Sequence, residues 1–329
     1  MRGNIFRIRT AAGVLLTAIA LSAVGSSVTA QKFHEVTLEP LSPVMTEIGG
    51  AAYMPPTRAA SPRPVEGPLR AVVNSDDRTP VLSESYPWSA IGRVDWLAAD
   101  GVTVLGACTG TLIGPQLVLT NAHCLLDPAT DEPTTHRITF RPNVVQGNAD
   151  ATATVVAYDY GGSPFSGDTA DDWALLTLDT PLGEQFGFLG WRNVNFADAD
   201  TLTAMAGQLS VVGYSADFPT AALSGLGQPG ETAGLSADCS ILTELSTGEF
   251  AGSLIHTCDT NPGASGAPIF ALFEDGEYYI VGLHTGSVSL LENVALPTGE
   301  QTDVLNRGIP VSRWAEQAIR LRRNAESQP

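Results

Sequence analysis

The chain has 329 residues, 43% of them hydrophobic, which is enough for one large domain or two moderate ones with a buried core. Its 35 acidic and 17 basic residues give a formal net charge of −18. Seven basic but only four acidic residues lie before residue 71, which leaves 10 basic and 31 acidic residues in the remainder. Because such an acidic surface repels nucleic acid and anionic membranes, we expect neither as a partner.

The N-terminus has the layout of a secretory signal peptide. Arg2, Arg7 and Arg9 precede an apolar run over residues 11–24, and the small residues of Val28–Ala30 would suit a cleavage site. The apolar run is too short for a comfortable membrane span. We therefore expect residues 1–30 to direct export and the protein to be secreted, to the periplasm or the medium.

Residues 31–70 differ in composition from the rest of the chain. Seven of these forty residues are proline, and no apolar periodicity is sustained. Such a stretch favours extended backbone and buries little surface. A linker and a propeptide are the two candidates, and the predicted export favours a propeptide.

From about residue 86 the chain becomes a succession of short β-rich runs separated by turn residues. The first series of predicted strands comprises 102–107, 117–120, 137–140, 152–158 and 173–178. The second series comprises 209–214, 253–257, 268–273 and 278–283. This spacing indicates an all-β sandwich or barrel, with two units at roughly 85–190 and 205–310 joined near residues 180–205.

Two local patterns complete the predicted fold. The stretch 273–278 contains Asp275-Gly276 between two apolar runs, which is typical of a hairpin tip. At the C-terminus Trp314, Ala318 and Leu321 are spaced as one helical face, so we expect a terminal helix over 311–324.

All four cysteines follow the proline-rich segment. An even number in an exported protein indicates two disulfides, with three possible connectivities. The pairs Cys108–Cys124 and Cys239–Cys258 close short loops and are preferred. A zinc site is the competing use of four cysteines, but no Cys-x-x-Cys spacing occurs.

The stretch "NPGASGAPIF" presents Ser265 between small residues, with Gly263 and Gly266 free to adopt unusual backbone angles. The turn is either merely tight or it exposes a nucleophile. A serine hydroxyl needs a base, and the base needs a group that orients it. His123 follows a strand-like run and adjoins a cysteine, whereas His136 follows a polar loop and looks solvated.

The candidate for the orienting acid is Asp172 in "DDWALLTL", because it directly precedes an apolar run; Asp171 is its neighbour. Each candidate alone has an ordinary structural explanation: a turn serine, a strand-end histidine and a loop aspartate. Their order along the chain, His123, Asp172 and Ser265, is nevertheless one of the known orders of a catalytic triad.

The blocks "GTLIGPQLVLTNAHC", "DDWALLTL" and "NPGASGAPIF" resemble those of chymotrypsin-like serine peptidases over most of residues 86–320. The resemblance implies two packed six-stranded antiparallel β-barrels. It implies that His123 is the general base, that Asp172 orients it, and that Ser265 attacks the scissile carbonyl. The N–H groups of Gly263 and Ser265 would form the oxyanion hole. The family's disulfide beside the histidine corresponds to Cys108–Cys124.

Within that family the chain resembles the bacterial glutamyl endopeptidases. Animal members have an aspartate before the nucleophile that pairs with the new N-terminus, whereas this chain has Ala264. The stretch "AVVNSDDRTPV" at 71–81 resembles the mature N-terminus of the glutamyl group. Cleavage after Arg70 would then release 31–70 and leave a peptidase domain spanning 71–329.

The same resemblance implies a preference for Glu, and then Asp, before the scissile bond. His284 and Thr260 match the residues that bind the substrate carboxylate, and Thr285 matches the serine that supports the triad aspartate. A histidine with an ordinary structural role on a strand is the alternative for His284. His256 is interpreted as structural.

Other functions are less consistent with the sequence. An α/β-hydrolase would need a Gly-x-Ser-x-Gly elbow and alternating strands and helices, and we find neither. A different pocket preference, for a small or apolar residue, and a non-catalytic binding relative stay open. We expect a monomer that acts on proteins or peptides and needs no cofactor or metal.

Overall fold

The computed structural model describes residues 49–58, 73, 76–296 and 299–326. The predicted signal peptide, most of the predicted propeptide and the expected new N-terminus, Ala71, lie outside these residues. None of the helices in the described part of the chain is long and apolar enough to cross a membrane.

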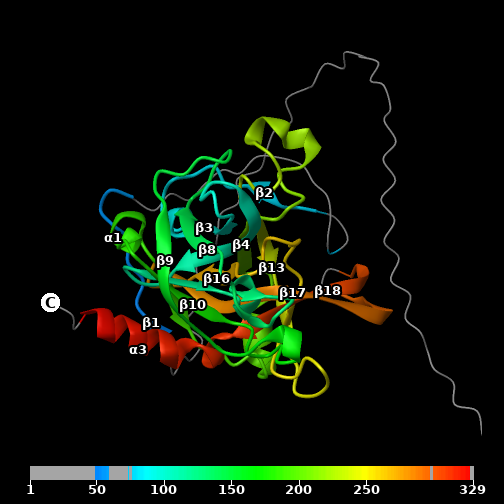
Figure 1. The fold of residues 1–329 in the computed structure, drawn as a ribbon. Helices are drawn as coiled ribbons and strands as arrows, with labels where there is room; N and C mark the ends of the chain where they lie inside the picture. Colours follow the sequence, from blue (N-terminus) through cyan, green and yellow to red (C-terminus); the bar gives the residue numbers. More distant parts are fainter. Residues whose placement is uncertain (1–48, 59–72, 74–75, 297–298, 327–329) are drawn as a thin grey trace, which may run out of the picture. The chain divides into compact units, whose positions relative to one another are not determined.

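The described residues are mostly β, as the sequence predicts. A closed six-stranded antiparallel barrel forms the first unit, with the strand order β10-β5-β4-β3-β8-β9 (Figure 1). Its strands are β3 (Ile91–Leu97), β4 (Val104–Leu112), β5 (Leu117–Thr120), β8 (Arg137–Pro142), β9 (Ala153–Tyr160) and β10 (Ala174–Leu178). The short strands β6 (Leu126–Asp127) and β7 (Glu132–Pro133) form a separate hairpin.

The second unit is a larger, mainly antiparallel sheet with the order β14-β15-β18-β17-β16-β12-β13-β2. Its strands are β2 (Thr79–Pro80), β12 (Leu209–Gly213), β13 (Gly234–Cys239), β14 (Ile241–Glu244), β15 (Leu254–His256), β16 (Pro268–Leu272), β17 (Tyr278–Ala295) and β18 (Gln301–Pro310). Ser240 alone separates β13 from β14, although these strands lie far apart in the pairing order. Strand pairing closes the first unit into a barrel but leaves this sheet open.

Several strands differ from the prediction made from the sequence. Strand β3 carries Arg93 and Asp95 among apolar residues, yet both are buried and pair with each other at 2.8 Å. Strand β17 runs to Ala295, far past the predicted end at 283, and its second half pairs with β18. The hairpin tip at 273–278 is confirmed, with Gly276 at φ +80°.

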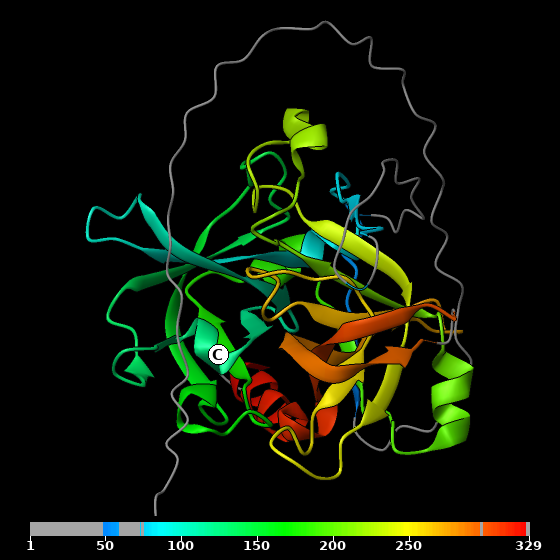
Figure 2. The same ribbon diagram turned by 90° about the vertical axis from the view of Figure 1, so that its right-hand side faces the viewer.

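The predicted C-terminal helix is present as a 3-10 turn, Val311–Arg313, followed by α3 (Ala315–Glu326). Trp314 and Ala318 are buried in the larger of the two main hydrophobic clusters. Figure 2 shows α3 beneath the junction of the two β units. The short helices α1 (Leu182–Phe186) and α2 (Ala199–Met205) lie in the connection between the units.

Part of the predicted propeptide is integrated into this fold. Strand β1 (Gly49–Gly50) pairs with β11 (Gly190–Arg192), which in turn pairs with β17. Tyr53 and Phe188 exchange two backbone hydrogen bonds of 2.9 Å. The Arg58 guanidinium lies 4.4 Å from the centre of the Phe186 ring. Residues 49–58 therefore act as a strap on the connection between the two β units.

We predict that Gly50→Val destabilises the full chain. A β-carbon at this position would lie 2.4 Å from ring atoms of Trp191, which is fully buried and packs against Trp314. Overpacking of this kind costs about 1–3 kcal/mol. The measurement is urea unfolding of the full chain. Gly106→Val is the matched control, because Gly106 has open space around it. Equal stability of the two variants would contradict the prediction.

Candidate active site

The loop before β16 holds Ser265 on a turn that requires glycine on both sides. Gly263 has φ +101°, and a β-carbon there would lie 2.4 Å from the Tyr214 carbonyl oxygen. Gly266 has φ +83°, and a β-carbon there would lie 2.2 Å from the carbonyl oxygen of Thr109. The two glycines beside this turn are thus required by positive φ and by close backbone contacts, and they do not indicate a flexible loop.

Strand β4 of the first unit binds two carbonyl groups of this loop. The Thr109 hydroxyl donates to the Gly263 carbonyl at 2.9 Å, and the Thr109 N–H donates to the Ser265 carbonyl at 2.8 Å. The N–H groups of Gly263 and Ser265 donate to no acceptor among the described residues. Both N–H groups are therefore available to an acceptor that the described residues do not supply.

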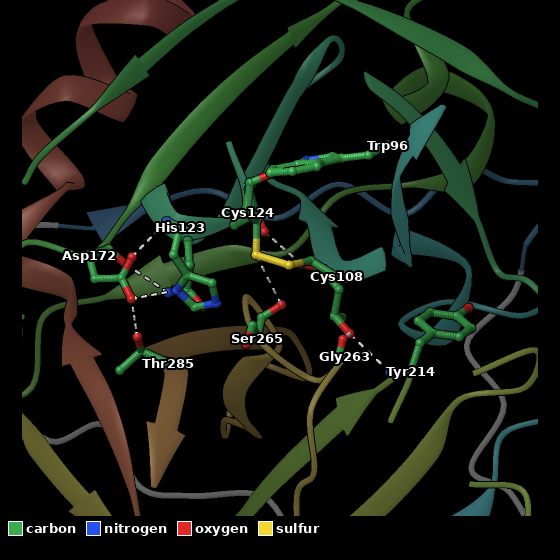
Figure 3. The surroundings of a disulfide bond; sticks show 12 residues. Trp96, Cys108, His123, Cys124, Asp172, Tyr214, Gly263, Ser265 and Thr285 are labelled. Carbon is green, nitrogen blue, oxygen red and sulfur yellow. Dashed lines mark hydrogen bonds and ion pairs between the residues drawn. A yellow bond between two sulfur atoms is a disulfide. The ribbon is translucent and has the colours of Figure 1, made fainter. Parts of the chain in front are cut away.

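His123 and Asp172 meet as the sequence predicts. His123 lies in the 3-10 turn Ala122–Cys124 after β5, and Asp172 lies just before β10. One carboxylate oxygen of Asp172 is 2.8 Å from His123 Nδ1, and the other accepts the His123 backbone N–H at 3.0 Å. Asp172 is 2% exposed, so its carboxylate is shielded from water. The imidazole lies between Asp172 and Ser265 (Figure 3).

Residues from both β units fix this pair. Thr285 of β17 donates its hydroxyl to the same Asp172 oxygen that faces the imidazole (Figure 3). Asp171, the neighbouring acid, instead forms an ion pair with Arg313 at 3.3 Å. Both predicted disulfides are present, and Cys108–Cys124 anchors the turn that carries His123.

A pocket of about 230 Å³ opens beside Ser265. Its walls come from the nucleophile loop and from strands β17 and β18. The lining residues are Thr260, Asn261, Pro262, Ser265, His284, Gly286, Ser287, Val304 and Asn306. Both residues predicted to bind a carboxylate, Thr260 and His284, are therefore pocket residues.

Behind the pocket, His256 contacts His284, a neighbour that sequence reasoning missed. His256 Nε2 lies 3.1 Å from His284 Nδ1 and 3.3 Å from the Arg307 carbonyl oxygen. In the tautomer with a proton on His256 Nε2, this nitrogen donates to the Arg307 carbonyl and to His284 Nδ1. His284 then carries its own proton on Nε2, which is a donor in this tautomer. The contact depends on the β15-β18-β17 order, so no local sequence pattern reveals it.

Burial keeps both imidazoles neutral. It lowers the pKa of His256 to about 3, and it lowers the pKa of His284 well below the usual range, with further lowering by nearby positive charge. In the unfolded chain both would titrate near pH 6.5. Above pH 6.5 both states are neutral and the stability is complete. Below it only the unfolded state binds protons, so stability falls as the pH drops.

We predict that the free energy of unfolding falls between pH 6.5 and pH 4 by up to about 1.4 kcal/mol per pH unit for each histidine. His256→Gln keeps a donor for His284 but does not titrate. Urea unfolding at several pH values should show a shallower slope for this variant, by about one proton. His136→Gln, which changes an exposed histidine, is the control. An unchanged slope in His256→Gln would refute the assignment.

Comparisons with known proteins agree with this architecture. The family model described as a trypsin-like peptidase domain matches residues 108–283. Over 232 residues the chain is 26% identical to the glutamyl endopeptidase of Bacillus licheniformis, covering 65% of this chain and 59% of that protein. A solved structure of a Glu endopeptidase in complex with MPD superposes with a TM-score of 0.55 at 22% identity, covering 77% of this chain and 99% of that one.

A second relative bears a different name. The chain is 25% identical over 253 residues to an extracellular metalloprotease of Bacillus subtilis, covering 75% of this chain and 70% of that protein. In the described part of the chain, one group of potential metal ligands gathers closely: Cys108, His123 and Cys124. Its two sulfurs form the disulfide, so they cannot serve as thiolate ligands.

The matched segment, residues 108–283, contains His123, Asp172 and Ser265, and it ends just before His284 and Thr285 of β17. Since the family model spans more than half of the sequence, the chain belongs to the trypsin-like peptidase family.

Proposed function

We propose that the protein is a serine endopeptidase that uses Ser265, His123 and Asp172. The observation that carries this proposal is the buried carboxylate of Asp172, bonded to His123 Nδ1 on one side of the imidazole while Ser265 lies on the other. An aspartate in this position stabilises the imidazolium that forms when histidine takes a proton.

In the proposed reaction Ser265 Oγ attacks the scissile carbonyl carbon and its proton passes to His123 Nε2. The oxyanion accepts hydrogen bonds from the free N–H groups of Gly263 and Ser265. The C–N bond then breaks as His123 donates the proton to the leaving amine, which leaves an ester on the serine. Water, activated by the same imidazole, hydrolyses this acyl-enzyme.

We further propose a preference for Glu, and more weakly Asp, before the scissile bond. In the pocket beside Ser265, the Thr260 hydroxyl and, in its Nε2-protonated tautomer, His284 can each donate a hydrogen bond to a carboxylate. The similarity of the chain to the glutamyl endopeptidase of Bacillus licheniformis supports this preference. The alternative is a pocket for a small or apolar residue, which the apolar contributions of Pro262 and Val304 would favour.

The predicted leader and propeptide belong to the same proposal. Residues 1–30 would direct export, which the similarity to an extracellular protease supports. Cleavage after Arg70 would then activate the enzyme. Because β1 is bound to β11, we expect the released segment to stay attached until the strap around residues 49–58 unfolds.

We predict that Ser265→Ala lowers peptidase turnover by on the order of 10⁴- to 10⁶-fold, because the nucleophile is lost while the fold is retained. Hydrolysis of a peptide and labelling by a serine-directed organophosphate are the two measurements. A surface variant, Ser166→Ala, is the control. Unchanged binding of a protein partner by Ser265→Ala, together with no turnover in the parent protein, would favour the non-catalytic alternative.

We predict that kcat/KM is at least about tenfold higher for a peptide with Glu before the scissile bond than for the same peptide with Gln. His284→Leu should reduce this ratio towards one while organophosphate labelling of Ser265 persists. His136→Leu, on the exposed surface, should leave the ratio unchanged. Equal turnover of the Glu and Gln peptides by the parent enzyme would remove the carboxylate pocket but not the triad.

A further inference from the structure

Arg307, in β18, is a buried cation with two nitrogens that bind no acceptor among the described residues. It is 9% exposed, and neither Nε nor Nη1 meets an acceptor among the described residues. The guanidinium lies 4.3 Å from the centre of the Phe250 ring, which covers one of its faces. A charged group buried with unpaired N–H groups is costly, and such groups concentrate where a ligand completes the bonding.

The charges around Arg307 do not satisfy it. Asp172 and Glu249 attract the guanidinium, and His284 is neutral, but no ion pair joins Arg307 to an acid in the part of the chain that the structure describes. The Asp172 carboxylate is already occupied by His123 and Thr285. A guanidinium stays protonated at physiological pH, so a positive charge is held here without a counter-ion in contact.

Strand pairing locates this charge beside the pocket. Arg307 pairs with Gly286, where a β-carbon would lie 3.7 Å from Arg307 Nη2. Asn306 lines the pocket, and successive residues of a strand face opposite sides, so Arg307 faces away from it. Because Gly286 has no side chain, it places no side-chain atom against Nη2.

A substrate has an open strand edge to occupy here. Strand β16 pairs with β17 only as far as Leu283, whereas β18 continues to pair with β17 to Ala295. Residues 285–289 therefore have one edge free of β16, and an extended peptide can add to it. If the residue before the scissile bond enters the pocket, alternation turns the second and fourth residues before the bond to the opposite side.

We infer that Arg307 is the base of a second acid-binding subsite, which takes a carboxylate side chain two or four residues before the scissile bond. The inference rests on the proposed peptidase function. The acidic group would accept a hydrogen bond from Nη2, the guanidinium nitrogen that lies nearest to Gly286. The preferred substrate would then be an acidic peptide segment instead of a single acidic residue.

The test uses the processed enzyme and peptides that all have Glu before the scissile bond. Each peptide has one further Glu at the second, third or fourth residue before the bond, and a partner with Gln there. We expect kcat/KM to favour Glu by roughly ten- to a hundredfold at the second or fourth residue and not at the third. Arg307→Met should abolish the preference, and Arg307→Lys should retain part of it.

Two variants control for charge and for folding. Arg320→Met removes the same charge from the exposed face of α3 and should leave the ratios unchanged. Gly286→Ala adds a β-carbon at ordinary contact distance from Nη2 and should lower the preference, even if Arg307→Met does not fold. Removal of an unpaired buried cation should not lower the melting temperature of Arg307→Met.

The inference is overturned if the parent enzyme shows no preference for Glu at the second or fourth residue before the bond. It is also overturned if Arg307→Met lowers kcat/KM for all peptides by one common factor. A common factor would mean that Arg307 acts through Asp172 or through the fold. These outcomes are distinct from failure of the proposed function. In that case no peptide is cut and Ser265 does not react with the organophosphate.

Discussion

The buried carboxylate of Asp172 is the constraint on which the rest of the site depends. It accepts hydrogen bonds from the N–H and the imidazole of His123, in the first β unit, and from the Thr285 hydroxyl, in the second. A carboxylate that is 2% exposed needs these donors, because an unpaired buried charge is very costly. The same bonds therefore satisfy a buried charge, orient the imidazole and fix the position of one β unit against the other.

Around this centre the protein leaves selected polar groups unpaired. The N–H groups of Gly263 and Ser265 point to no acceptor in the described residues, and Arg307 retains two free nitrogens. His256 is fully buried, and its Nδ1 is also without a partner there. Each unpaired group lowers the stability of the folded state. In the proposed complex a bound peptide supplies acceptors for the N–H groups of Gly263 and Ser265 and for Arg307.

The sequence predicted the elements whose hydrophobic pattern is local. The run at Leu117–Thr120, the hairpin tip before Tyr278 and the C-terminal helix occur close to their expected bounds. Strand β3 was missed because Arg93 and Asp95 satisfy each other only in the folded barrel. The sequence predicted that residues 49–58, as part of a propeptide, bury little surface, because their two-residue strand gains its stability from β11 and Trp191 and not from its own sequence.

The sequence by itself determined the all-β class, and it predicted the two disulfides and the pairing of His123 with Asp172, since each lies in a block with its own local pattern. Only the tertiary structure decided that His256 stands behind His284 and that Arg307 lies beneath Gly286. The physical reason is that sheet order and register bring together residues far apart in the chain. A single sequence gives the residues of each strand, but it does not say which strand lies beside it.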